Sequence, residues 1–106
     1  MENSNHCVVM TTCSNREDAH KIISALLNEQ LAACIQIFDV TSFYFWKGAV
    51  NTDPEVMLFV KSKEVLYSQI EECIKANHNY ETPEIIQVPI VNGAASYLNW
   101  MNEVTK

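Results

Sequence analysis

The order in which hydrophobic periodicities follow one another along the chain is what most limits its fold. A short apolar run at residues 6–12 is typical of a buried strand, and a helical pattern follows it. Ser14 lies three residues before Glu17, a capping-box spacing that predicts a helix start at Ser14. The apolar positions of this predicted helix recur every three or four residues and so share one face: Ala19, Ile22, Ile23, Leu26 and Leu27.

Two extended patterns come next and indicate a long hairpin. Residues 31–46 are rich in residues that favour strands, and residues 56–61 alternate apolar side chains onto one face. Between them, Lys47 and Gly48 begin a turn, and residues 51–54 continue it as a polar connection. We therefore expect two strands joined by a long polar connection.

The remaining chain repeats the helix–strand succession. Ser62 is the predicted cap of a second helix, residues 84–90 predict a fourth strand, and residues 94–104 predict a short last helix. The order βαββαβ predicts an α+β fold, a ferredoxin-like sandwich with a long central hairpin and an extra C-terminal helix. Right-handed crossovers would put both long helices on one face of the sheet. We expect residues 1–106 to form one domain.

The opposite face of the predicted sheet needs a cover. The hairpin strands carry five large apolar side chains that could occupy it: Phe38, Phe43, Phe45, Met57 and Phe59. An exposed patch of this size is typical of an interaction surface. Oligomerisation through the sheet would cover it, and so would the terminal helix and the hairpin within one chain.

Composition excludes several function classes. The formal net charge of −6 argues against a nucleic-acid binder and against docking on anionic membranes. No apolar run approaches the roughly 20 residues of a membrane span, and the first residues carry no signal-peptide pattern. We therefore expect a cytoplasmic protein. In such a reducing compartment the four cysteines are expected to be small apolar packing residues, with Cys34 and Cys73 in the core, and their spacing argues against a zinc site.

A dense polar segment lies between the second helix and the fourth strand. It holds His78, Tyr80, Glu81 and Glu84, and Pro83 stiffens it. This combination of an imidazole, a phenol and carboxylates is typical of a held, hydrogen-bonded loop. The alternative is that the carboxylates are ordinary surface charges and that His78 faces the dipole at the end of the helix.

Motifs along nearly the whole chain make it similar to the CutA divalent-cation tolerance proteins. They are Leu31-Ala32-Ala33-Cys34, Thr41-Ser42 with Tyr44, Trp46 and Gly48, then Glu55, Lys61, His78-x-Tyr80-Glu81-x-Pro83-Glu84-Ile85-Ile86, Pro89-Ile90, and Gly93 with Tyr97-Leu98-x-Trp100. The resemblance implies a cytosolic homotrimer whose sheets meet edge to edge and whose long hairpin reaches a neighbour. It also implies a role tied to divalent metals, often copper, without an established enzymatic reaction.

The resemblance also implies where a copper ion would bind. The family's proposed ligand positions correspond to Thr11, Asn77 and His78, and only His78 retains a metal-binding type of side chain. Threonine and an amide are poor ligands for Cu(I). Cys13 would share a strand face with Thr11, but about 7 Å further along at a rise of ~3.3 Å per residue. We expect no required cofactor and at most weak binding of copper or another divalent cation.

A second candidate site is a cleft built from Trp46, Lys61, Tyr80, Glu81 and Glu84. If a subunit interface assembles them, they supply a cation, acceptors, a phenol and an aromatic wall, which suit a small polar ligand. The trimer design resembles that of PII signalling proteins, which bind effectors at subunit clefts. The alternative is a polar network that only fixes the trimer and has no metal site.

Catalysis is not expected. His78, Glu81 and Glu84 include groups capable of acid–base chemistry. However, the chain has no nucleophile elbow, and glycines only at positions 48 and 93 leave no phosphate-binding loop. The sequence therefore predicts a protein that acts by binding.

Overall fold

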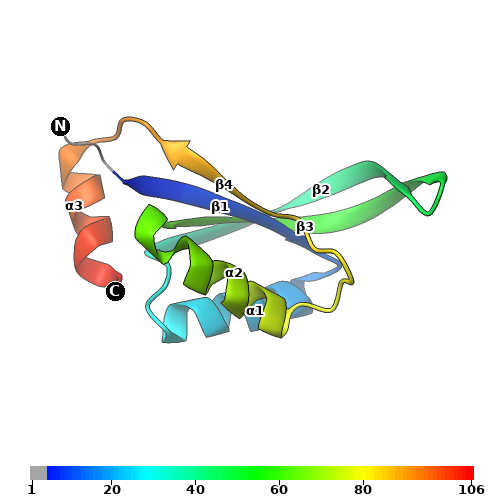
Figure 1. The fold of residues 1–106 in the computed structure, drawn as a ribbon, viewed down its shortest axis with the longest axis horizontal. Helices are drawn as coiled ribbons and strands as arrows, with labels where there is room; N and C mark the ends of the chain where they lie inside the picture. Colours follow the sequence, from blue (N-terminus) through cyan, green and yellow to red (C-terminus); the bar gives the residue numbers. More distant parts are fainter. Residues whose placement is uncertain (1–4) are drawn as a thin grey trace.

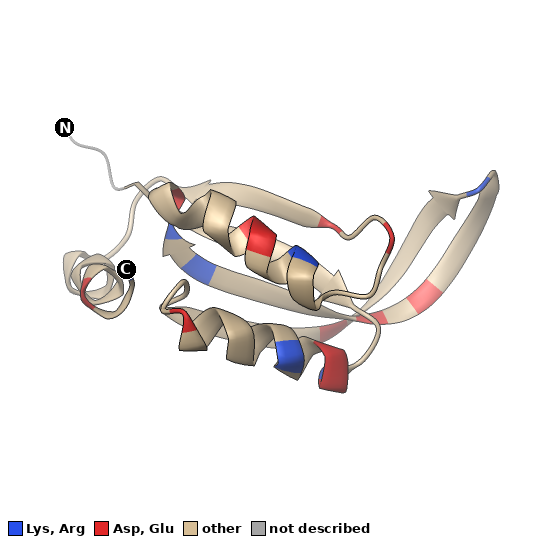
Figure 2. Ribbon diagram, turned by 60° about the horizontal axis from the view of Figure 1, so that its bottom comes forward, with Lys and Arg blue, Asp and Glu red and all other residues tan. Residues whose placement is uncertain are grey.

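Four antiparallel strands form one sheet in the order β2-β3-β1-β4, and the computed structural model describes residues 5–106. The strands are β1 (His6–Cys13), β2 (Cys34–Trp46), β3 (Ala49–Lys63) and β4 (Ile85–Ile90). The helices are α1 (Arg16–Asn28), α2 (Tyr67–Asn77), preceded by the short turn η1 (Glu64–Leu66), and α3 (Ala95–Val104). Helices α1 and α2 lie side by side on one face of the sheet (Figure 1, Figure 2). The predicted α+β, ferredoxin-like βαββαβ order with a C-terminal helix is confirmed.

The core lies between the sheet and these two helices. Side chains alternate along each strand, so Val9 of β1 and Leu58 and Val60 of β3 point to the helix-covered face and are fully buried. The helices contribute Ile22, Leu26, Ile70 and Ile74 to the same core.

Among the cysteines, Cys7 and Cys13 are fully buried, whereas Cys34 and Cys73 are only partly buried. Cys73 packs against this core as expected, whereas the expectation that Cys34 belongs to it is wrong.

The β2–β3 hairpin is longer and tighter than the sequence indicates. Its two-residue turn is Lys47-Gly48, and both residues have positive φ, at 52° and 81°, as two-residue hairpin turns of type I′ require. Residues 51–54 are part of β3 and pair with β2, so the predicted polar connection is wrong. Pro54 is tolerated because β1 pairs only as far as Val56, which leaves β3 with a single neighbour at this position.

Two predicted helix caps are also wrong. Asn15, not Ser14, is the N-cap of α1, and its side-chain oxygen accepts a hydrogen bond from the backbone N–H of Asp18 at 2.8 Å. Ser62 lies in β3, where its hydroxyl donates to the carbonyl oxygen of Leu31 at 2.6 Å. In both cases the serine hydroxyl makes a tertiary hydrogen bond instead of capping a helix.

The face of the sheet opposite α1 and α2 is only partly covered. Helix α3 packs at one end of it, where Asn102 lies 2.9 Å from the His6 ring nitrogen Nε2. Beyond α3, Phe38, Ile86 and Val88 remain 41%, 47% and 43% exposed. The hairpin extends away from this face (Figure 1). Helix α3 therefore covers only one end of the face, and the rest stays open within one chain.

The strand register corrects the expected composition of this open face. Phe38 pairs with Met57, and Gln36 pairs with Phe59, so Phe38, Met57 and Phe59 share the open face. Phe43 and Phe45 have the opposite alternation and lie on the part of the hairpin that extends past β1. At 72% and 80% they are exposed, but they are not part of the open face.

Candidate functional site

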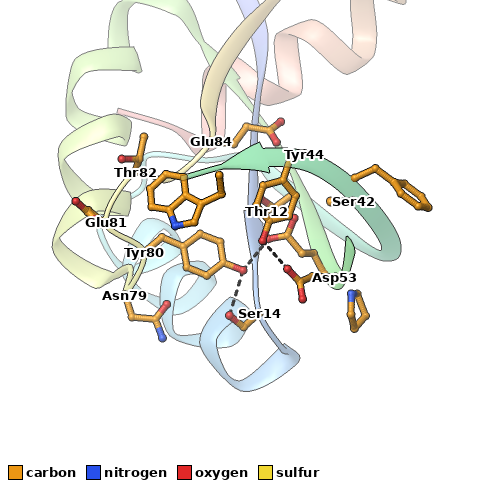
Figure 3. A pocket seen from close by; sticks show the side chains of 14 residues that line it. Thr12, Ser14, Ser42, Tyr44, Asp53, Asn79, Tyr80, Glu81, Thr82 and Glu84 are labelled. Carbon is orange, nitrogen blue, oxygen red and sulfur yellow. Dashed lines mark hydrogen bonds between the residues drawn. The ribbon is translucent and has the colours of Figure 1, made fainter. Parts of the chain in front are cut away.

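A surface cavity of about 870 Å³ lies where the α2–β4 loop approaches the hairpin (Figure 3). Its lining comes from the end of β1, from both hairpin strands and from the loop. Four of its lining residues are carboxylates, namely Asp53, Glu55, Glu81 and Glu84. Four are aromatic, namely Phe43, Tyr44, Trp46 and Tyr80, and none is lysine, arginine or histidine.

The loop that forms one wall begins where α2 ends. The Asn77 amide donates back to the carbonyl oxygen of Cys73 at 2.8 Å, and His78 then turns the backbone into an extended conformation. The His78 ring fastens the loop to β1, because its Nε2 lies 2.7 Å from the backbone oxygen of Thr12. Its Nδ1 accepts the backbone N–H of Tyr80 at 3.1 Å. A carbonyl only accepts and a backbone N–H only donates, so these partners assign the ring proton to Nε2.

Tyr80 connects this loop to the sheet. Its hydroxyl donates to the Glu55 carboxylate at 2.6 Å and accepts from the Ser14 hydroxyl at 3.1 Å. Its ring lies against the His78 ring, with centroids 4.6 Å apart. Burial, followed by the hydrogen bond to Glu55, raises the pKa of Tyr80 to about 12. The phenol is therefore held neutral and stays a hydrogen-bond donor.

The hairpin wall repeats this pairing of a phenol with a carboxylate. The Tyr44 hydroxyl donates to Asp53 across the two strands (Figure 3). This hydrogen bond is the main cause that raises the pKa of Tyr44. Glu84, on the loop side, has a raised pKa because of burial and, second, because of the negative charge of Glu55. The cavity thus holds carboxylates close enough to repel one another.

The CutA1 divalent ion tolerance model matches residues 7–104. This chain belongs to that family. It is 41% identical over 99 residues to the CutA protein of Thermus thermophilus, covering 92% of this chain and 96% of that protein. The solved Archaeoglobus fulgidus CutA superposes with a TM-score of 0.93 at 33% identity, covering 95% and 99% of the two chains. The chloroplastic CutA 1 of rice is 39% identical over 93% of this chain, which spans 56% of the rice protein.

The cavity contains most residues of the cleft predicted from the sequence. Trp46, Tyr80, Glu81 and Glu84 line it together. Lys61 does not line it, and its ammonium nitrogen lies 5.7 Å from the ring centroid of Tyr97 instead. Within one chain the cavity therefore has the acceptors, the phenol and the aromatic wall, but not the cation.

The sequence alone does not show which side chains pair at this cavity. It predicts a polar connection at Asp53 and a helix cap at Ser14, but these side chains instead hydrogen-bond the two phenols. Glu55 and Tyr44 were among the family motifs, but the sequence did not show that each pairs with a partner at this site. Strand pairing of residues 51–54 with β2 was the missing information.

The side chains at the three family metal positions are buried or already hydrogen-bonded. Thr11 is fully buried on the helix-covered face, and the Asn77 amide is occupied by the Cys73 carbonyl. Both ring nitrogens of His78 are engaged with backbone groups. Within residues 5–106, no group of three or more histidine, cysteine, aspartate or glutamate side chains is placed to hold a metal ion.

None of the described helices is long and apolar enough to cross a membrane.

Proposed function

We propose that this chain acts in divalent-cation tolerance as a cytoplasmic homotrimer that works by binding and not by catalysis. The observation that carries the proposal is the cavity, which four carboxylates line without any lysine, arginine or histidine. Such a surface attracts cations. Family membership supports the biological role, because relatives from several organisms are named divalent-cation tolerance proteins.

The uncovered sheet face supports assembly. Ile86 on this face and Leu27 on α1 are almost equally exposed, at 47% and 46%. If the open face is the interface, Ile86→Glu will dissociate the trimer, whereas Leu27→Glu will leave it intact. Light scattering at micromolar concentration is expected to give three subunits for the wild type. A folded monomer in the wild type, or equal effects of the two variants, would contradict this assembly.

Metal binding through the family positions is expected to be weak in this chain, because only His78 remains and both its ring nitrogens are used. Competition against a calibrated Cu(I) chelator tests this. We expect little change with His78→Ala, and a clear gain when Thr11→Cys and Asn77→His are combined, because soft ligands dominate Cu(I) affinity. Tight stoichiometric binding in the wild type that disappears with His78→Ala would contradict the expectation.

A second candidate function is the binding of a small polar effector in the cavity, as PII-like trimers do. Its volume of about 870 Å³ and its aromatic lining favour this function, because a single metal ion needs neither. Native mass spectrometry of protein purified without added metal reports subunit count, bound metal and retained small molecules together. A trimer that carries a small molecule supports this second function, and a trimer that carries a divalent cation without a small molecule supports the first.

A further inference from the structure

We propose that the cavity beside Tyr80 binds an organic cation, a protonated amine or a guanidinium group attached to an apolar body. This inference rests on the proposed small-ligand function of the cavity and names its ligand class. Three features of the described residues carry it: the charge of the lining, the direction of its hydrogen bonds and its aromatic wall.

The charge of the lining is uncompensated. Glu55 and Asp53 each accept a hydrogen bond from a phenol hydroxyl. Because a phenol is a neutral donor, the negative charge of each carboxylate remains. Glu81 and Glu84 make no hydrogen bond or ion pair with any other described residue. The raised pKa of Glu84, caused by burial and by the charge of Glu55, is the effect expected where carboxylates accumulate. A bound cation would relieve this repulsion, and an anion would increase it.

The hydrogen-bond directions select a ligand that donates. Both phenol hydroxyls in the cavity already give their protons to carboxylates, and the Asn79 amide gives one of its protons to Asp18 at 3.3 Å. The remaining carboxylate lone pairs of the lining meet no lysine, arginine or histidine that also lines the cavity. Ammonium and guanidinium groups supply several N–H donors together with positive charge, so they fit this lining better than a neutral alcohol does.

The aromatic side chains of the lining favour binding of an organic cation over binding of a metal ion. Tyr44 and Tyr80 are fixed by their carboxylate partners, and Trp46 lines the same cavity. Aromatic faces attract cations, and indole does so most strongly. The Lys47 ammonium nitrogen lies 5.9 Å from the Trp46 ring centroid, so this indole already attracts one cation of the same chain. The volume of about 870 Å³ leaves room for an apolar body beside the charged group.

Three benzyl compounds of similar shape and different charge test the proposal on the assembled protein: benzylammonium, benzyl alcohol and benzoate. Ligand-observed NMR titration measures each affinity. We expect benzylammonium to bind at least about ten-fold more tightly than benzyl alcohol, and benzoate not to bind, since the N⁺–H donors meet carboxylates. The preference for benzylammonium is expected to weaken with added salt.

Two variants locate the binding. Glu84→Gln removes one charge from the cavity and Trp46→Leu removes the indole, and each is expected to weaken benzylammonium binding about five-fold. Glu72→Gln, on the exposed side of α2, removes an equal charge outside the cavity and is expected to have no effect. Circular dichroism of each variant confirms folding, and the two cavity variants check each other if one of them fails to fold.

Several results would overturn the proposal. Equal binding of the three benzyl compounds would show an apolar site without charge selection. Benzylammonium binding that Glu84→Gln and Trp46→Leu leave unchanged would place the ligand elsewhere. No benzylammonium binding, together with dissociation of the trimer by Glu84→Gln, would show that a second copy of this chain fills the cavity. The copper titration and light scattering described above test the cation-tolerance trimer separately, so its failure is distinguishable from these results.

Discussion

The Tyr80 hydroxyl donates to the Glu55 carboxylate at 2.6 Å, and this bond joins the α2–β4 loop to β3 although β1 separates β3 from β4 in the sheet. It crosses the end of β1, where Ser14 donates to the same hydroxyl at 3.1 Å. The three residues come from three segments that are distant in sequence. The loop wall of the cavity is therefore positioned by side chains, because no backbone ladder connects it to the hairpin.

Removing this hydroxyl will loosen the loop. Tyr80→Phe deletes the donor to Glu55 and keeps the ring, and we expect a loss of about 1 kcal/mol in the free energy of unfolding. The cost stays moderate because Glu55 is partly exposed and water can replace the phenol. Urea denaturation measures the change. Tyr97→Phe is the control, since the Tyr97 hydroxyl makes no hydrogen bond with another described residue, and an equal loss in both variants would contradict this role of Tyr80.

Alkaline pH will act through the same phenol. The folded-state pKa of Tyr80 is raised from 10.0 to about 12, so the native state keeps a proton that the unfolded state releases first. The stabilisation is complete below pH 10 and is lost as the pH rises toward 12. Stability measured across this range is expected to fall less steeply in Tyr80→Phe than in the wild type. Parallel pH curves for the two proteins would show that Tyr80 has an ordinary pKa.

The fold could be predicted where one face of an element is buried. Helix α1 has a clear apolar face because α1 packs on the sheet, and β1 is mostly buried on both faces, so its apolar run is continuous. Residues 51–54 lie where β3 has one neighbour and solvent on both faces, so no apolar alternation marks them as a strand. The periodicity of apolar residues in a sequence follows from burial, so the sequence of a strand exposed on both faces resembles that of a loop.

The candidate site was less predictable, because it depends on register. The expected cleft grouped Lys61 with Trp46 and the loop, but Lys61 lies six residues beyond Glu55 on β3, about 20 Å along the strand. Which carboxylate meets which phenol likewise follows from strand pairing and not from spacing in the sequence. The residue types indicate a polar cleft, and only the three-dimensional arrangement shows that no lysine, arginine or histidine among the described residues lines it.

Thiol reactivity will follow burial. Cys7 and Cys13 are fully buried, and burial is the main cause that raises the pKa of each thiol to about 11. Because the thiolate is the reactive form, we expect both to resist a thiol reagent in the native protein and to react in denaturant. Cys73, which is only partly buried on α2, is the internal comparison. Peptide mass spectrometry after brief labelling measures the order, and native labelling of Cys7 as fast as Cys73 would contradict it.

Loss of the His78 ring will affect stability and not metal content. His78→Ala removes two hydrogen bonds, one to Thr12 and one from Tyr80, and we expect unfolding to become easier by about 1–3 kcal/mol. His20→Ala on the exposed side of α1 is the control and is expected to be near neutral. Thermal unfolding and elemental analysis of the same samples separate the two roles. A changed metal content with unchanged thermal stability would assign His78 to a metal.

Glu84→Gln will stabilise the protein near neutral pH. The folded-state pKa of Glu84 is raised, first by burial and then by the charge of Glu55, so the native state holds a proton that the unfolded state has already released. The native state is therefore penalised as the pH rises above 4.5, and the neutral amide removes the penalty. Although Glu84 is partly desolvated, its side chain remains largely exposed to solvent, so the gain is expected to stay within the roughly 0–1 kcal/mol of solvent-screened charges. The gain should vanish below pH 4.5, where the wild-type carboxyl is protonated in both states. Thermal unfolding at neutral and acidic pH measures it, and a destabilised variant at neutral pH would show that the Glu84 charge already has a cationic partner in the assembled protein.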